Sequence, residues 1–261
     1  MPVYSHSKLE TFKTCPLKYK YRYIDKIEKP DEQSIEAFVG SRVHEALRKL
    51  YEDLQTGRLN RVAHLVEFYN AEWNAKYGPG IKIVRAGTNQ SDYHRYGERC
   101  IRNYYAQYAP FDQSETLHIE EHFLFDLDPS GQLKLQGYMD RVARRPDGAF
   151  EIHDYKTGRS VPTQQHADVD GQLGLYQMAL QSQRPEARRV VLLWHYLGHS
   201  RTLRSARRPE QLVQLRESTT AVIHRIELTK DFPPHKSPLC DWCEYKPECP
   251  LWGGSPPARS K

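Results

Sequence analysis

The 261-residue sequence has no long apolar run. No stretch approaches the roughly 20 apolar residues that cross a bilayer, and the opening residues, MPVYSHSKLETFKTCP, hold no apolar core of a signal peptide. We therefore expect a cytoplasmic chain without a membrane partner. A Walker-type phosphate loop is missing as well, which excludes a helicase or a nucleoside triphosphatase.

Cysteine is scarce. There are five, and an odd number without an export signal argues against a disulfide framework. Cys240, Cys243 and Cys249 fall within ten residues near one end, and Cys15 lies near the other. Four thiolates can hold a structural zinc ion or an iron–sulfur cluster, and the spacing alone favours zinc. Cys100 falls in a helical stretch, where we expect an ordinary buried thiol.

Neither sign of charge dominates. Lys and Arg number 38 against 33 Asp and Glu, and the net charge of +5 permits a polyanionic partner without requiring one. Basic and aromatic residues alternate in KYKYRYIDK, residues 18–26. That pattern is typical of nucleic-acid binding, in which cations pair with phosphates and rings stack on bases. It fits at least as well an amphipathic segment whose tyrosines pack while its lysines face the solvent.

The apolar period changes near residue 115. Before it the pattern is helical: Ser7 and Glu10 have capping-box spacing for a short helix that ends near Cys15, and longer helices are predicted over 32–54, 61–77 and 92–109. After it the period falls to two, which predicts strands over 116–125, 133–145, 149–156, 190–197 and 200–206. Helices are predicted over 168–183 and 209–228. This order indicates a mixed α/β core preceded by a helical part.

Two charged residues occupy the apolar face of a predicted strand. Asp154 and Lys156 follow Phe150 and Ile152 at the two-residue period. Burying them costs free energy unless they are paired or bind something. An ion pair between the two is the simplest explanation, and such pairs add little stability.

Three further polar residues lie at comparable positions: Glu121 on the first strand, Asp140 on the second and His44 on the long helix. Singly, such residues more often have a structural role. Here, however, Asp140 and Asp154 lie on strands joined by a tight RPDG turn. Two carboxylates and an imidazole suit Mg²⁺ or Mn²⁺, which can polarise a phosphate and activate a water. A lysine beside them, Lys156, can stabilise charge in the transition state, so the set indicates phosphodiester hydrolysis.

Four motifs occur in order: G-S-R-V-H-E (residues 40–45), G-Y-M-D (137–140), D-Y-K-T (154–157) and Q-L-G-L-Y (172–176). Together they resemble the His motif, the two core motifs and the QxxxY motif of RecB-like PD-(D/E)XK nucleases. The resemblance covers residues 5–249 and implies a restriction-endonuclease-like mixed sheet. The residues before Asp140 depart from the proline in the family's name.

The resemblance also implies a role for each site residue. The metal ligands would be His44, Asp140, Asp154 and the backbone carbonyl of Tyr155. Lys156 would be the catalytic lysine, and Glu121 matches an acidic position ahead of the core motifs in some relatives. The catalytic set would be completed by Gln172 and Tyr176, which would support Lys156 or contact the DNA backbone.

The cysteines resemble the iron–sulfur staple of AddB-type and CRISPR-associated RecB-like nucleases. This likeness implies a [4Fe–4S] cluster, with zinc as the alternative, held by Cys15, Cys240, Cys243 and Cys249. Such a staple would fix residues 18–26 beside the nuclease core. In that setting we expect DNA contacts, mainly to phosphates, from Lys18, Lys20, Tyr21, Arg22 and Tyr176.

We therefore predict a single nuclease domain over residues 1–252 and a disordered tail over 253–261. Within the domain, the helical part spans 30–110, the nuclease core spans 115–230, and the staple joins Cys15 to 240–249. The implied function is an exonuclease for single-stranded or frayed DNA with free ends, in DNA repair, recombination or defence. A helicase or integrase would be its protein partner. The alternatives are a trimming nuclease of CRISPR spacer acquisition and a DNA-binding subunit of a helicase–nuclease complex.

Overall fold

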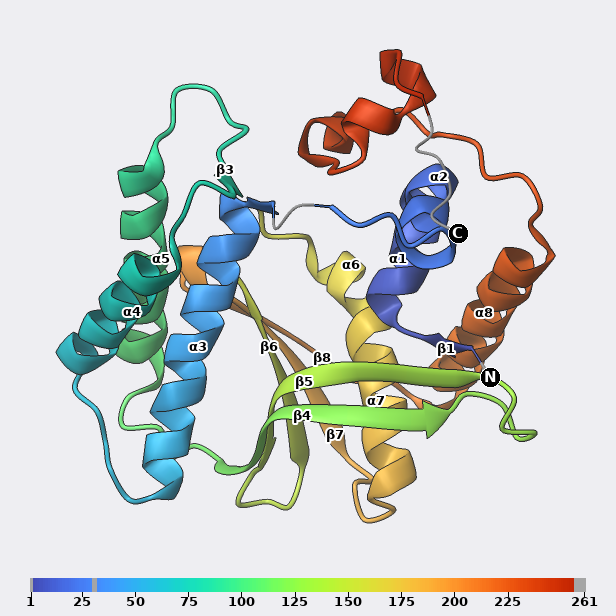
Figure 1. The fold of residues 1–261 in the computed structure, drawn as a ribbon. Coiled ribbons are helices and arrows are strands. Elements are labelled where there is room, and N and C mark those ends of the chain that lie inside the picture. Colours follow the sequence, from blue (N-terminus) through green and yellow to red (C-terminus); the bar gives the residue numbers. More distant parts are fainter. Residues whose placement is uncertain (1, 30–31, 256–261) are drawn as a thin grey trace.

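The computed structural model describes residues 2–29 and 32–255, and a six-stranded mixed sheet forms its centre (Figure 1). The strands run in the order β1-β5-β6-β7-β8, with β4 paired to β5. β6 and β7 are parallel, whereas β4–β5, β5–β6 and β7–β8 are antiparallel. The bounds are β1 (Val3–Tyr4), β4 (Glu115–Asp126), β5 (Lys134–Arg144), β6 (Phe150–Lys156), β7 (Val190–Tyr196) and β8 (Arg201–Ser205). The expected mixed α/β class is confirmed.

Helices form two separate apolar clusters with the sheet. The first contains α3 (Ile35–Gln55), α4 (Val62–Lys76) and α5 (Gln90–Tyr108), together with Tyr155 of β6. β2 (Gln33–Ser34) and β3 (Ile81–Lys82) form a small parallel sheet beside them. The second cluster contains α1 (His6–Thr14), α7 (Gly171–Gln183) and α8 (Pro209–Leu228). Within the described ranges, no helix is both long and apolar enough to cross a bilayer.

Several boundaries differ from the prediction. The N-cap of α1 is Ser5 rather than Ser7, because the Ser5 hydroxyl accepts the Lys8 N–H at 3.2 Å. The helix predicted over 168–183 is two helices, α6 (Gln164–Val169) and α7, since Asp170 leaves the helical conformation and caps α7.

The chain around the cysteines is built from short turns. A helical turn, α2 (Pro16–Tyr19), continues into a π-helical segment over Lys20–Ile24. Short 3₁₀ turns cover Pro238–Trp242, Lys246–Glu248 and Pro250–Trp252. Of the predicted disordered tail, 256–261 lie outside the described residues, and the N–H groups of Gly253 and Gly254 bond back to Pro250 and Cys249.

The sheet forks where β5 and β6 part. Their ladder runs from Arg144↔Phe150 to Arg141↔His153 and then stops. β6 continues beside β7 as far as Lys156, whereas β5 stays with β4 and reaches β1 at its other end. Figure 1 shows β4 and β5 leaving β6 at a steep angle. The residues next to the last ladder pair, Asp140 and Asp154, therefore lie at the fork.

Candidate active site

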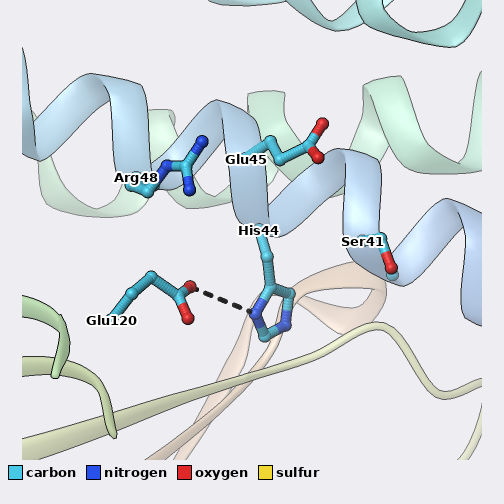
Figure 2. A pocket seen from close by; sticks show the side chains of 6 residues that line it. Ser41, His44, Glu45, Arg48 and Glu120 are labelled. Carbon is cyan, nitrogen blue, oxygen red and sulfur yellow. Dashed lines mark ion pairs between the residues drawn. The ribbon is translucent and has the colours of Figure 1, made fainter. Parts of the chain in front are cut away.

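Three side chains from three elements converge at this fork. They are His44 from α3, Glu120 from β4 and Asp140 from β5, and their ligand atoms all lie within 4.8 Å of one another. His44 Nδ1 lies 3.5 Å from Asp140 Oδ1 and 3.9 Å from Glu120 Oε1. Figure 2 shows the imidazole of His44 pointing away from its helix toward the Glu120 carboxylate. Two carboxylates and one imidazole are a donor set that fits a divalent cation such as Mg²⁺ or Mn²⁺.

Backbone contacts from β6 orient this cluster. The carbonyl oxygen of Tyr155 lies 2.8 Å from His44 Nε2, and the Tyr155 N–H donates to Asp140 Oδ2 at 2.7 Å. Burial alone lowers the pKa of His44, but the charge of Asp140, a hydrogen bond with its carboxylate and the hydrogen bond to the Tyr155 carbonyl raise it to about 9. In the absence of a cation the imidazole is therefore protonated, and it supplies a positive charge between the acids.

β4 contributes Glu120 to the cluster. The two-residue alternation of side chains along a strand predicts the next residue, Glu121, instead. Glu120 has a φ of 51°, in the left-handed region that non-glycine residues rarely adopt. The pairs on either side, Ile119↔Arg141 and Glu121↔Met139, place it opposite Asp140. The carboxylate of Glu121 instead lies 3.4 Å from His118. Because the backbone departs from regular strand geometry at one residue, the sequence period could not identify Glu120.

A second group of side chains joins β6 to α7. Lys156 Nζ lies 2.7 Å from Asp154 Oδ2 and donates to Gln172 Oε1 at 2.9 Å. The Gln172 amide in turn donates to Asp154 Oδ1 at 3.1 Å and to the Tyr176 hydroxyl at 3.0 Å. Gln172 thus fixes the Asp154–Lys156 pair, and its spacing of one helical turn from Tyr176 puts both on one face of α7.

Burial and neighbouring charge shape this second group. Asp154 is only 4% exposed. Burial raises its pKa, Lys156 opposes that shift and Asp140 reinforces it, and the resulting value is about 6. Burial lowers the pKa of Lys156, but the charges of Asp154 and Asp140 raise it by more. The pKa of Lys156 therefore lies above its ordinary value, and the lysine stays protonated. Asp154 is not part of the His44–Glu120–Asp140 group; both of its oxygens contact Gln172 or Lys156.

Two pockets flank these groups. The first, of about 430 Å³, is lined by Gly40, Ser41, His44, Glu45, Arg48 and Glu120 (Figure 2). The second, of about 410 Å³, reaches Gln172 and Tyr176 and is lined otherwise by α1 and the strands β4 and β5. His44 and Glu120 thus line a pocket on the α3 side, and Gln172 and Tyr176 line one on the α1 side.

The basic segment 18–26 is engaged within the protein. Lys18 pairs with Glu244 at 2.7 Å, Lys20 pairs with Asp25, and Arg22 lies 3.9 Å from Glu244. Tyr21 is 2% exposed, and its ring packs edge-on against Tyr245. A buried ring cannot stack on a base, so the structure corresponds to the packed amphipathic alternative at Tyr21.

Four thiols line one small pocket between the two ends of the chain: Cys15, Cys240, Cys243 and Cys249. Backbone N–H groups of His235 and Ser237 donate to the sulfurs of Cys15 and Cys240, each at 3.4 Å. Among the described residues, no three of these sulfurs come within 4.8 Å of one another. Cys100 is fully buried in α5, as expected, and burial raises its pKa to about 12.

Comparison with known proteins yields a family and a fold. The family model for the PD-(D/E)XK nuclease superfamily matches residues 3–250. A crystal structure named "Putative exonuclease", from Eubacterium rectale, superposes with a TM-score of 0.50 at 11% identity, over 92% of this chain and 86% of that one. The structure of SSO0001 has a TM-score of 0.35 at 16% identity, over 94% and 93% of the two chains. No curated protein matches.

Proposed function

Since the chain belongs to the PD-(D/E)XK nuclease superfamily, we propose that it is a Mg²⁺- or Mn²⁺-dependent exonuclease acting on single-stranded or frayed DNA. The observation that carries this proposal is the cluster of His44, Glu120 and Asp140 at the sheet fork, beside the Asp154–Lys156 pair. A structural ion pair alone would not need the additional imidazole and two carboxylates that the fork brings together.

Each residue has a defined task in this proposal. His44, Glu120 and Asp140 hold the cation, and Asp154 and the Tyr155 carbonyl lie beside them as further oxygen donors. When bound, the cation polarises the scissile phosphate and lowers the pKa of a water. Lys156 keeps its proton and stabilises the charge that develops on the phosphate. Gln172 holds the Lys156 ammonium by a 2.9 Å hydrogen bond, and Tyr176 holds Gln172.

End-directed cleavage is supported by the name of the Eubacterium rectale neighbour, which is similar in fold. Linear single strands labelled at either end should be shortened in the presence of Mn²⁺, and a circular single strand should resist. Asp154→Ala and Lys156→Ala should abolish cleavage. The matched controls are Asp126→Ala and Lys134→Ala, an acid–lysine pair on β4 and β5 in which the acid is more exposed than Asp154 and the lysine about as exposed as Lys156.

Full activity in Asp154→Ala or Lys156→Ala would refute the assignment. Binding of DNA without metal-dependent cleavage would instead favour the DNA-binding subunit of a helicase–nuclease complex. Rapid cutting of circular strands would change the proposal from exonuclease to endonuclease. The roles in repair, recombination, defence or spacer trimming, and the helicase or integrase partner, stay predictions of the resemblance.

For the thiol pocket we propose a [4Fe–4S] cluster rather than zinc. The four thiols share one pocket, and four thiolates are the ligand set of a [4Fe–4S] cluster. The N–H donors to Cys15 and Cys240 suit a cluster, whose charge such bonds stabilise.

A further inference from the structure

The pocket on the α1 side differs chemically from the pocket on the α3 side. Among the described residues that line it, none is acidic; its polar groups include the side chains of Ser5, His6, Ser7 and Gln136. The α3-side pocket contains the carboxylates of Glu45 and Glu120. A phosphate is repelled less by hydroxyl, amide and imidazole groups than by carboxylates. The α3-side pocket therefore suits a cation, and the α1-side pocket suits a nucleic-acid strand.

An exposed aromatic side chain forms one wall of the α1-side pocket. Tyr138 on β5 is 59% exposed. Its ring packs against His122 of β4, with centroids 4.9 Å apart and planes tilted by 52°. Tyr138 precedes Asp140 by two residues, so both project from the same face of the strand, about 7 Å apart along it. An exposed ring this close to a metal ligand, already supported by a second ring, is suited to stacking on a planar ligand.

At Gly137, the residue before Tyr138, two aromatic rings occupy the space that a side chain would need. A Cβ at this position would come within 2.7 Å of the Phe123 ring and 3.3 Å of the Tyr176 ring. The rings therefore pack directly on the backbone of β5, and the pocket lining extends past Gly137 from Tyr138 to Gln172 and Tyr176. At about 410 Å³, the pocket falls in the range that binds small organic ligands.

We propose that the α1-side pocket binds the nucleotide next to the scissile phosphate, with its base stacked on Tyr138 and its sugar–phosphate facing Ser5, His6 and Ser7. This inference rests on the proposed nuclease function and adds a substrate subsite to it. A base inside a duplex is stacked on both faces by its neighbours, so only an unpaired or frayed nucleotide can lay its base on the ring. Tyr138 thereby selects single-stranded substrate.

Binding is tested first without catalysis. Fluorescence anisotropy of a short labelled single-stranded oligonucleotide, measured in EDTA, should show roughly tenfold weaker binding to Tyr138→Ala. Tyr138→Phe should bind like the wild type, because the ring alone stacks. Leu124→Ala is the matched control, since Leu124 is an exposed apolar residue on the neighbouring strand β4 that does not line the pocket.

A second measurement locates the base. Oligonucleotides with a single abasic nucleotide, moved one position at a time, should lose affinity for the wild type at one position, and Tyr138→Ala should be insensitive there. In the Mn²⁺-dependent reaction, Tyr138→Ala should raise KM about tenfold and change kcat less than twofold, since stacking contributes to binding rather than to the chemical step.

The outcomes separate the subsite from the nuclease assignment. Equal affinity of wild type and Tyr138→Ala, or no position-specific abasic effect, overturns the subsite even if the wild type cleaves DNA. Position-specific binding in EDTA by a protein that never cleaves supports the subsite and overturns the nuclease proposal. A wild type that binds no single strand overturns the subsite outright.

Discussion

Two adjacent glutamates give a sharp test of the metal site. Glu120 has its carboxylate 3.9 Å from His44 Nδ1 and belongs to the three-residue cluster, whereas Glu121 contacts His118. Glu120→Gln and Glu121→Gln each remove one charge from β4 and keep side-chain size. Only the first should weaken Mn²⁺ binding.

The magnitude follows from distance and exposure. Two unit charges 4 Å apart interact by about 4 kcal/mol at an effective dielectric constant of 20. The Glu120 side chain is 33% exposed, so water screens part of this interaction. Allowing for that screening and for the carbonyl-type oxygen that Gln retains, we expect a loss of about 1.4 to 2.8 kcal/mol, or roughly tenfold to a hundredfold in affinity.

Without a bound cation, Glu120→Gln should not destabilise the protein. Burial raises the pKa of Glu120, and the Asp140 carboxylate raises it further, so the ionised acid is destabilised without a cation. Glu120→Gln should therefore unfold at an equal or higher temperature than the wild type in EDTA, yet gain less from Mn²⁺. At a Mn²⁺ concentration of 100 times the wild-type Kd, the wild type gains about 2.7 kcal/mol, and a variant that binds tenfold more weakly gains about 1.4 kcal/mol.

Isothermal titration with Mn²⁺ in the absence of DNA measures the affinity directly, and thermal unfolding with and without Mn²⁺ measures the linked stability. If Glu121→Gln weakened binding as much as Glu120→Gln, or if Glu120→Gln bound Mn²⁺ with wild-type affinity, the placement of Glu120 in the metal site would be refuted.

Three further predictions concern the core and the staple. Burial lowers the pKa of His153 and of His195; the next cause is Arg141 for His153, and His153 for His195. Each histidine therefore takes up a proton on unfolding once the pH falls below about 6.5. The free energy of unfolding is retained above that pH and falls below it by up to about 1.4 kcal/mol per pH unit for each histidine. Urea unfolding between pH 7 and 5 should show this slope, and His153→Gln should reduce it; an unchanged slope in the variant contradicts the assignment. Gly137→Ala places a Cβ 2.7 Å from the Phe123 ring and should lower the free energy of unfolding in urea by about 1 to 3 kcal/mol. Gly78→Ala, whose Cβ would meet nothing within 4 Å, should not lower it. Cys243→Ser should lose the visible-light absorbance of anaerobically prepared protein and unfold at lower temperature, whereas Cys100→Ala should keep the chromophore; stoichiometric zinc in place of iron in the wild type would contradict the cluster.

Charges at apolar positions made much of the site predictable from sequence. His44 and Lys156 stand out because each interrupts an apolar face, and Asp140 because a tight turn joins its strand to that of Asp154. The structure brings His44 and Asp140 together and puts Lys156 beside Asp154. The order of the longer helices and strands could also be predicted, because the period of the apolar residues changes from 3.6 to 2 near residue 115.

Three features of the structure could not be predicted from local sequence patterns. Glu120 enters the cluster through a left-handed φ that no residue pattern announces. Asp170 interrupts a helix whose apolar period runs on across it. The α1-side pocket depends on pairing between β1 and β5, far apart in the chain, which local periodicity cannot register.

The segment 18–26 shows a different limit of sequence patterning. Alternating Lys and Tyr fit both a DNA-contacting surface and an amphipathic packing surface. The acid that pairs with this segment, Glu244, lies more than 200 residues away and meets Lys18 and Arg22 only through the fold. Composition alone could not show that these cations are paired within the protein.

The most direct test of the proposed active site is the single-turnover rate of Mn²⁺-dependent cleavage of a linear, end-labelled single strand by wild type and Lys156→Met. With Mn²⁺ affinity and DNA binding verified as unchanged, the variant should be slower by a factor of about 100 to 1,000, because it lacks the ammonium that stabilises the developing phosphate charge. Cleavage by Lys156→Met at the wild-type rate, or wild-type cleavage that persists in EDTA, would contradict the proposed active site.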